Sequence, residues 1–136
     1  MATIHKEILI DARPEAVWDA VRDVGAVHKR LTPGVLTNAH MDGDARVVTF
    51  ANGLVLRELI VTIDDEARRF AYASVQGRAT HHNASMQVFA DGENHSRIVW
   101  ITDVLPDELA QSISQLVELG SQAMKQTLES QAVGNP

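Results

Sequence analysis

The chain of 136 residues contains no cysteine. Disulfide bonds, thiolate metal sites and cysteine nucleophiles are therefore excluded. Long apolar stretches are absent too, because no run approaches the ~20 residues that a membrane-spanning helix needs. The first residues also lack the apolar core of a signal peptide. These absences predict a soluble cytoplasmic protein with no membrane span.

An excess of positive charge is also missing. Lysine and arginine number 12 against 18 aspartate and glutamate residues, which gives a formal net charge of −6. Nucleic acid is therefore not expected as a partner, because binding to phosphates needs a basic surface. The hydrophobic share of 45% is ordinary for a globular protein. At this length the sequence predicts a single domain spanning residues 1–136.

Most of the chain has the pattern of β-strands. Apolar and polar residues alternate, and glycine- or aspartate-containing turns separate the runs. Asn52-Gly53 is a strong signal for a two-residue hairpin, because both residues accept positive φ. Strands joined by such short turns must be antiparallel. The pattern predicts about seven strands, over residues 4–10, 35–41, 46–51, 54–63, 69–75, 80–90 and 96–104.

Helical spacing occurs after the first strand and at the end of the chain. Pro14 suits the first turn of a short helix over residues 14–24, and a second short helix or turn is predicted over 26–31. Residues 106–131 have the apolar stripe of one long helix. Gly120 costs this helix about 1 kcal/mol relative to alanine. It indicates either close packing on the sheet or room for a ligand.

A curved sheet and one long helix cannot close over each other without leaving space between them. This space predicts a pocket for a small, mostly apolar molecule.

The order of the elements resembles that of the START-related (SRPBCC) superfamily, and in particular of its bacterial polyketide cyclase/dehydrase-like proteins. The likeness covers roughly residues 3–132, with short motifs at 14–18, 57–59 leading to 64–66, and 97–100. The resemblance implies an α+β helix-grip fold. In this fold about seven antiparallel strands form a curved sheet around the long C-terminal helix, and two short helices follow the first strand.

Strand alternation and the helical stripe predict which residues face the pocket. On the last strand the opposite face, which carries Trp100 and Thr102, competes with the one chosen. The predicted lining residues are Val48, Phe50, Leu56, Glu58, Ile60, Phe70, Tyr72, His82, Ala84, Met86, Val99, Ile101, Asp103, Leu116, Gly120 and Met124.

Glu58 and His82 are the candidate catalytic residues if the protein is an enzyme. The resemblance also implies that both residues lie in the cavity, because in the superfamily's hormone receptors they align with a cavity glutamate that binds ligand through water and with a cavity tyrosine. A carboxylate among apolar neighbours must be paired, hydrated or protonated, so a buried salt bridge between Glu58 and Arg46 is the alternative. His82 titrates near neutrality, but it also fits a satisfied core histidine. Tyr72 offers a hydroxyl to a ligand or packs in the core.

These residues favour binding of a small hydrophobic or aromatic ligand, without a cofactor. His81 and His82 point to opposite faces of their strand and cannot share an ion, so no metal site is expected. One alternative is an enzyme like the polyketide cyclases and dehydratases, with cavity residues as acid and base. A protein-binding regulator is the second alternative. The sequence leaves the oligomeric state open, including a homodimer.

Overall fold

The computed structural model describes residues 2–75 and 77–134. A seven-stranded antiparallel sheet has the order β1-β7-β6-β5-β4-β3-β2, so the first strand pairs with the last. The elements are β1 (Ala2–Ile10), α1 (Pro14–Arg22), a 3-10 turn (Val24–Ala26), α2 (Val27–Arg30), β2 (Leu36–Asp42), β3 (Ala45–Phe50), β4 (Val55–Asp64), β5 (Arg69–Ser74), β6 (His81–Ala90), β7 (Ser96–Leu105), a second 3-10 turn (Asp107–Leu109) and α3 (Ala110–Gly134). This is the predicted helix-grip fold.

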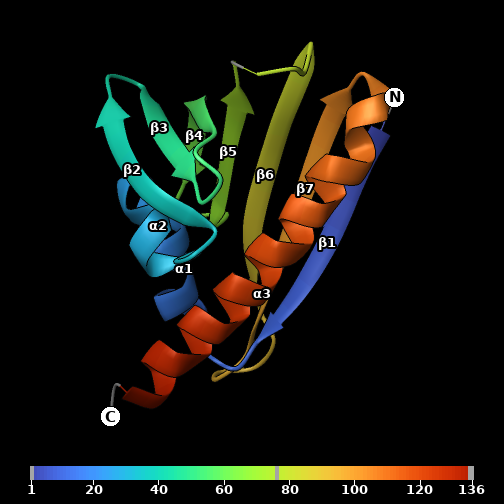
Figure 1. Cartoon of the computed structure of the whole chain (residues 1–136). Helices are drawn as coiled ribbons and strands as arrows, with labels where there is room; N and C mark the ends of the chain where they lie inside the picture. The colour runs from blue at the N-terminus through green and yellow to red at the C-terminus, as the bar shows by residue number, and fades with distance from the viewer. Residues whose placement is uncertain (1, 76, 135–136) are drawn as a thin grey trace.

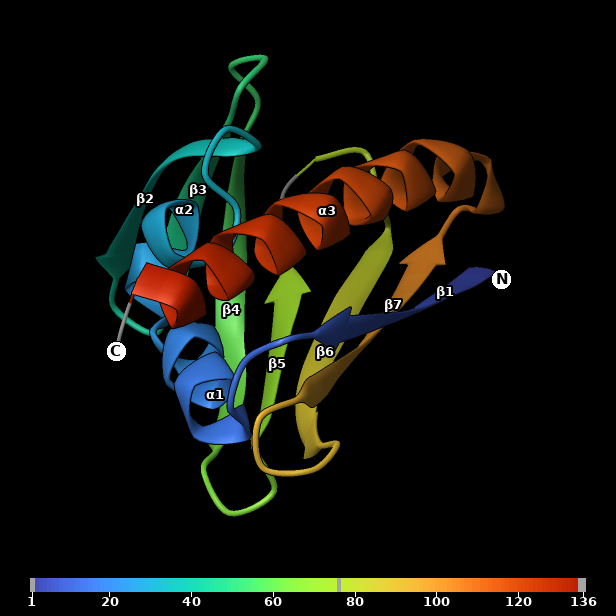
Figure 2. The ribbon, with the colours of Figure 1, turned by 90° about the horizontal axis from the view of Figure 1, so that it is seen from below.

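The helix α3 crosses one face of the sheet diagonally, and the sheet curves around it (Figures 1 and 2). Besides Gly120, its buried residues are Val117, Ser121, Met124 and Leu128, which recur every three or four positions and form one stripe. This stripe faces the sheet, and α3 also contacts β1 and α2. Among the described residues no helix is long and apolar enough to cross a membrane.

Local sequence explains the turns and the curvature. Gly53 has φ of +91° in the turn between β3 and β4, and the Asn52 side chain accepts a hydrogen bond from the Leu54 N–H. Register shifts interrupt the pairing between Leu36 and Asn38 in β2 and between Ile60 and Thr62 in β4. Such irregularities bend a strand and increase its twist. Both lie in the half of the sheet that β4, β3 and β2 form.

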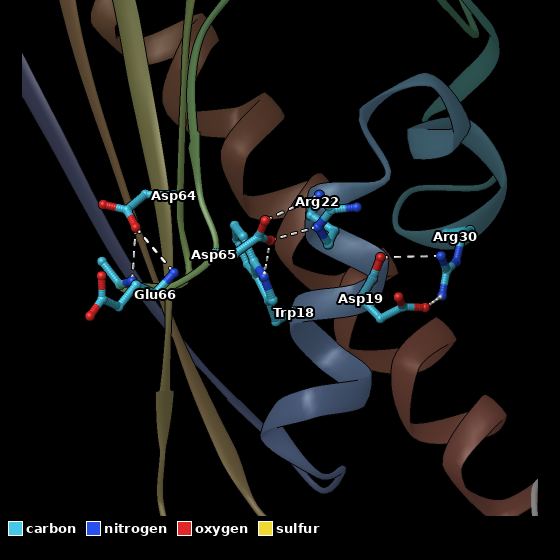
Figure 3. A network of polar contacts seen from close by, with 8 residues as sticks. Trp18, Asp19, Arg22, Arg30, Asp64, Asp65 and Glu66 are labelled. Atoms are coloured by element: carbon cyan, nitrogen blue, oxygen red, sulfur yellow. Dashed lines mark hydrogen bonds and ion pairs between the residues drawn. The ribbon is translucent and has the colours of Figure 1, made fainter.

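A polar network fixes α1 to the turn between β4 and β5 (Figure 3). Asp65 in this turn accepts hydrogen bonds from Trp18 Nε1 at 2.9 Å and from Arg22 Nε at 2.7 Å. The neighbouring Asp64 accepts backbone N–H bonds within the turn and orders it. This network helps to hold α1 against the sheet, where it contacts β6 and β7.

Candidate functional site

A cavity of about 90 Å³ lies between the sheet and α3. Apolar side chains from β2 to β7, α2 and α3 form most of its wall. The lining residues are Val27 of α2, Thr32 and Val35 of the following loop, Leu36 of β2, Arg46, Val48 and Phe50 of β3, Leu56 and Glu58 of β4, Tyr72 of β5, His82 and Met86 of β6, Trp100 and Thr102 of β7, and Ile113, Leu116, Val117, Gly120 and Met124 of α3.

The structure brings a large part of the predicted lining set together in this cavity. The residues placed there are Val48, Phe50, Leu56, Glu58, Tyr72, His82, Met86, Leu116, Gly120 and Met124. Of three others, Phe70 and Ala84 belong to the buried core and Ile60 packs against it, and none of them lines the cavity. Phe70 stacks on the Tyr72 ring with their centroids 5.3 Å apart, so it supports the cavity wall from behind.

The face chosen for β7 was wrong. Val99, Ile101 and Asp103 are only half-buried, and the alternate residues, Trp100 and Thr102 among them, are buried. Both faces of this strand carry large apolar residues, so its own pattern could not decide.

The pairing with β6 does decide the face of β7. Directly opposed residues of antiparallel strands share a face, and Trp100 lies opposite Met86 while Thr102 lies opposite Ala84. The Asp103 carboxylate instead accepts a hydrogen bond from Thr3 Oγ1 at 2.7 Å on the other face.

Glu58 forms a buried ion pair with Arg46. Arg46 Nε lies 2.8 Å from Glu58 Oε1, and the two side chains are 4% and 10% exposed. Arg46 Nη1 also donates to the Val24 carbonyl at 3.1 Å, and the guanidinium lies 5.1 Å from the ring centroids of Phe70 and Tyr72. These contacts offset the cost of removing both charges from water. The salt-bridge alternative for Glu58 is therefore the one found.

His82 and Tyr72 present polar groups that are neutral at pH 7. Burial lowers the pKa of His82 below its ordinary value, and the opposing attraction of Glu58 is the smaller influence. Burial raises the pKa of the Tyr72 phenol, so its hydroxyl keeps its proton. A neutral imidazole can accept a proton or a hydrogen bond, and a phenol can donate one.

Trp100 explains the glycine in α3. A Cβ atom on Gly120 would lie 3.1 Å from Trp100 Cη2 and 3.2 Å from Cζ3, which is tighter than normal packing. The glycine therefore lets the indole ring approach the helix backbone closely. Close packing of the helix on the sheet therefore explains Gly120. Because Gly120 and Trp100 both line the cavity, this contact forms part of its wall.

Sequence reasoning missed the contributions of α2 and of the buried Arg46 to the wall. The segment over residues 26–31 was predicted only as a short helix or turn, and its contact with the cavity depends on how α2 packs against α3. Arg46 was identified as a partner for Glu58 but not as a lining residue. Within residues 2–75 and 77–134, no group of three or more histidine, aspartate or glutamate residues could hold a metal ion.

Comparison with known proteins places this geometry in a family. The family model for polyketide cyclase / dehydrase and lipid transport matches residues 1–131. No curated protein matches the chain.

Several solved structures share the fold at low sequence identity. An uncharacterised protein from Bacillus thuringiensis superposes with a TM-score of 0.84 at 18% identity, over 93% of this chain and 98% of that one. Norcoclaurine synthase from Thalictrum flavum, in complex with dopamine and hydroxybenzaldehyde, gives 0.75 at 18%, over 99% and 88%. The di-domain ARO/CYC BexL from the BE-7585A biosynthetic pathway gives 0.82 at 14%, over all of this chain and 48% of that one.

Proposed function

Because the chain belongs to the polyketide cyclase / dehydrase and lipid transport family, we propose that it binds a small apolar or aromatic molecule in the cavity between the sheet and α3. The observation that carries this proposal is the composition of the wall, where apolar side chains predominate and a few polar groups converge. Small-molecule sites have this character.

The size of the cavity limits the ligand. Sites for drug-sized molecules typically have volumes of 300–1,000 Å³, whereas this cavity has about 90 Å³. We therefore expect a compact molecule. Because a cavity of about 150 Å³ holds benzene, even a single substituted ring would have to displace side chains such as Met86 and Met124, which adapt readily. The single-ring compounds bound to norcoclaurine synthase, a protein of the same fold, agree with this size.

A second function, acid–base catalysis, is favoured by the neutral imidazole of His82 on the cavity wall. His82 would remove a proton from the carbon next to a ligand carbonyl, and the electron pair would move to the carbonyl oxygen. The Tyr72 hydroxyl would donate a hydrogen bond to the resulting enolate. His82 is the better base of the two original candidates, because the carboxylate of Glu58 is already engaged by Arg46.

Calorimetric titration with acetophenone tests the binding function. Leu116→Trp places extra volume in the cavity from α3, while Leu119→Trp, on the same helix at a position 52% exposed, is the matched control. We expect Leu116→Trp to weaken binding by about tenfold or more, corresponding to at least about 1.4 kcal/mol, and Leu119→Trp to leave it unchanged. Equal affinities in both variants would contradict the proposed site.

The catalytic candidate is tested with the same molecule. Proton NMR in D₂O follows exchange of the acetophenone methyl protons, which are next to the carbonyl. Catalysis predicts that the protein accelerates this exchange and that His82→Gln removes the acceleration without abolishing binding. Exchange no faster than in buffer would count against catalysis of this type.

A further inference from the structure

The turn between β3 and β4 contains a chemically labile pair of residues. Asn52 is the only asparagine of the chain that is followed by a glycine. In such a pair the backbone nitrogen of the glycine can attack the side-chain carbonyl carbon of the asparagine, because glycine has no side chain to obstruct the approach. Asn52 and Gly53 are both exposed, so water has access to the reacting groups.

Two hydrogen bonds hold the groups that react. The Leu54 N–H donates to the side-chain oxygen of Asn52 at 3.0 Å. This bond spans Gly53, so the side-chain carbonyl of Asn52 lies alongside the peptide that contains the attacking nitrogen. The Gly53 N–H itself donates to the Phe50 carbonyl at 2.9 Å. The carbonyl carbon is therefore held near the attacking nitrogen, while that nitrogen is occupied by a bond of the turn.

The reaction of this pair needs water and hydroxide as its only co-reactants. Hydroxide takes the Gly53 amide proton, and the nitrogen then forms a bond to Asn52 Cγ. The bond between Cγ and the side-chain nitrogen breaks, and this nitrogen takes a proton from water and leaves as ammonia. Water then opens the resulting cyclic imide at one of its two carbonyl groups, which gives aspartate or isoaspartate at position 52.

We propose that Asn52 is a site of spontaneous deamidation, and that the hydrogen bond from the Gly53 N–H to the Phe50 carbonyl controls how fast the folded protein reacts. The reaction needs no ligand and so goes beyond the proposed binding function. In the isoaspartate product the backbone gains a carbon atom, which lengthens the loop that the Phe50 N–H and the Leu54 carbonyl close at 2.8 Å. Because Phe50 and Leu56, on either side of the turn, line the cavity, this product loosens one margin of the cavity wall.

Mass spectrometry of the tryptic peptide 47–57 measures the reaction. This peptide contains Asn52 as its only asparagine, and chromatography separates its unmodified, aspartate and isoaspartate forms. The protein is incubated in mildly alkaline buffer, either folded or unfolded in guanidinium chloride. We expect Asn52 to react at least about tenfold more slowly in the folded protein, because the turn must first open; this factor corresponds to an opening free energy of at least about 1.4 kcal/mol. The internal controls are Asn38, Asn83 and Asn94, none of which precedes a glycine, and they should react more slowly than Asn52 in the unfolded protein.

Amide hydrogen exchange followed by NMR identifies the controlling bond. Exchange at Gly53 also begins with loss of the amide proton and also requires the bond to the Phe50 carbonyl to open. The protection factor of the Gly53 N–H should therefore match, within about threefold, the factor by which folding slows deamidation. Folded protein aged until part of Asn52 is isoaspartate should show faster exchange at the Phe50 N–H in that part. Asn52→Asp is the matched control: it has the added charge without the longer backbone, so it should keep the protection of Phe50.

The outcomes test each part of the proposal. Absence of product at Asn52 in the unfolded protein would overturn the site itself. Equal rates in folded and unfolded protein, or a slowing far larger than the Gly53 protection factor, would overturn control by the bond to Phe50. Unchanged exchange at Phe50 in the isoaspartate form would overturn the loosening of the cavity margin. These measurements use no ligand, so failure of acetophenone to bind would count against the proposed function alone.

Discussion

Replacing Arg46 with methionine should be among the most damaging changes in the cavity wall. Methionine retains much of the apolar volume but leaves the Glu58 carboxylate buried without its partner at 2.8 Å. It also removes the bond to the Val24 carbonyl and the contact with the two aromatic rings. Breaking a buried pair in this way costs about 3–5 kcal/mol, a large part of the 5–15 kcal/mol that stabilises a typical domain.

Circular dichroism measures this loss as a free energy of unfolding in urea and as a melting temperature on heating. At about 4 °C per kcal/mol for a domain of this size, the melting temperature should fall by roughly 10 to 20 °C. The double variant Arg46→Met/Glu58→Leu removes both charges and should recover most of the loss, because no uncompensated charge is left. Arg57→Met, which breaks a more exposed pair with Asp42, is the control and should cost far less. A change for Arg46→Met no larger than for Arg57→Met would refute the reasoning.

Three further predictions concern other parts of the wall and its support. Gly120→Ala gains helix propensity but pushes Trp100 into the cavity. We therefore expect a free energy of unfolding within about 1 kcal/mol of that of the unaltered protein, together with weaker binding of acetophenone. Tighter binding would contradict the contact between Gly120 and Trp100. Because burial lowers the pKa of His82, the contribution of this residue to the free energy of unfolding is complete above pH 6.5 and is lost as the pH falls from there toward the lower pKa of the folded state. His82→Gln should flatten this part of the curve of unfolding free energy, measured with urea, against pH. An unchanged slope would contradict the burial. Asp65→Ala removes the acceptor shared by Trp18 and Arg22, so hydrogen exchange should accelerate in α1 but not in α3, and unaltered exchange in α1 would argue against the network.

The fold could be predicted from local signals. The hairpin at Asn52-Gly53, the alternation of the strands and the single apolar stripe of the last helix each specify a local structure. Short connections then leave few ways to order an antiparallel sheet. The predicted fold, a curved antiparallel sheet around the C-terminal helix, agrees with the structure.

The site was harder to predict, because its wall depends on pairing and packing between distant segments. Trp100 and Val99 are neighbours of similar apolar character, and only the register with β6 shows which one faces inward. Phe70 has the right character and the right face, but it lies behind Tyr72. Sequence alternation identifies the face of a strand but not whether a side chain reaches the cavity or fills the core beside it.

The most direct test of the binding site is a titration of the protein, labelled with ¹³C in its methionine methyl groups, with acetophenone. Met86 and Met124 line the cavity, and Met41 lies on β2 with 46% of its surface exposed. Binding between the sheet and α3 predicts saturable shifts of the Met86 and Met124 methyl signals and none for Met41. Saturable binding that leaves the signals of both cavity methionines unchanged would contradict the account.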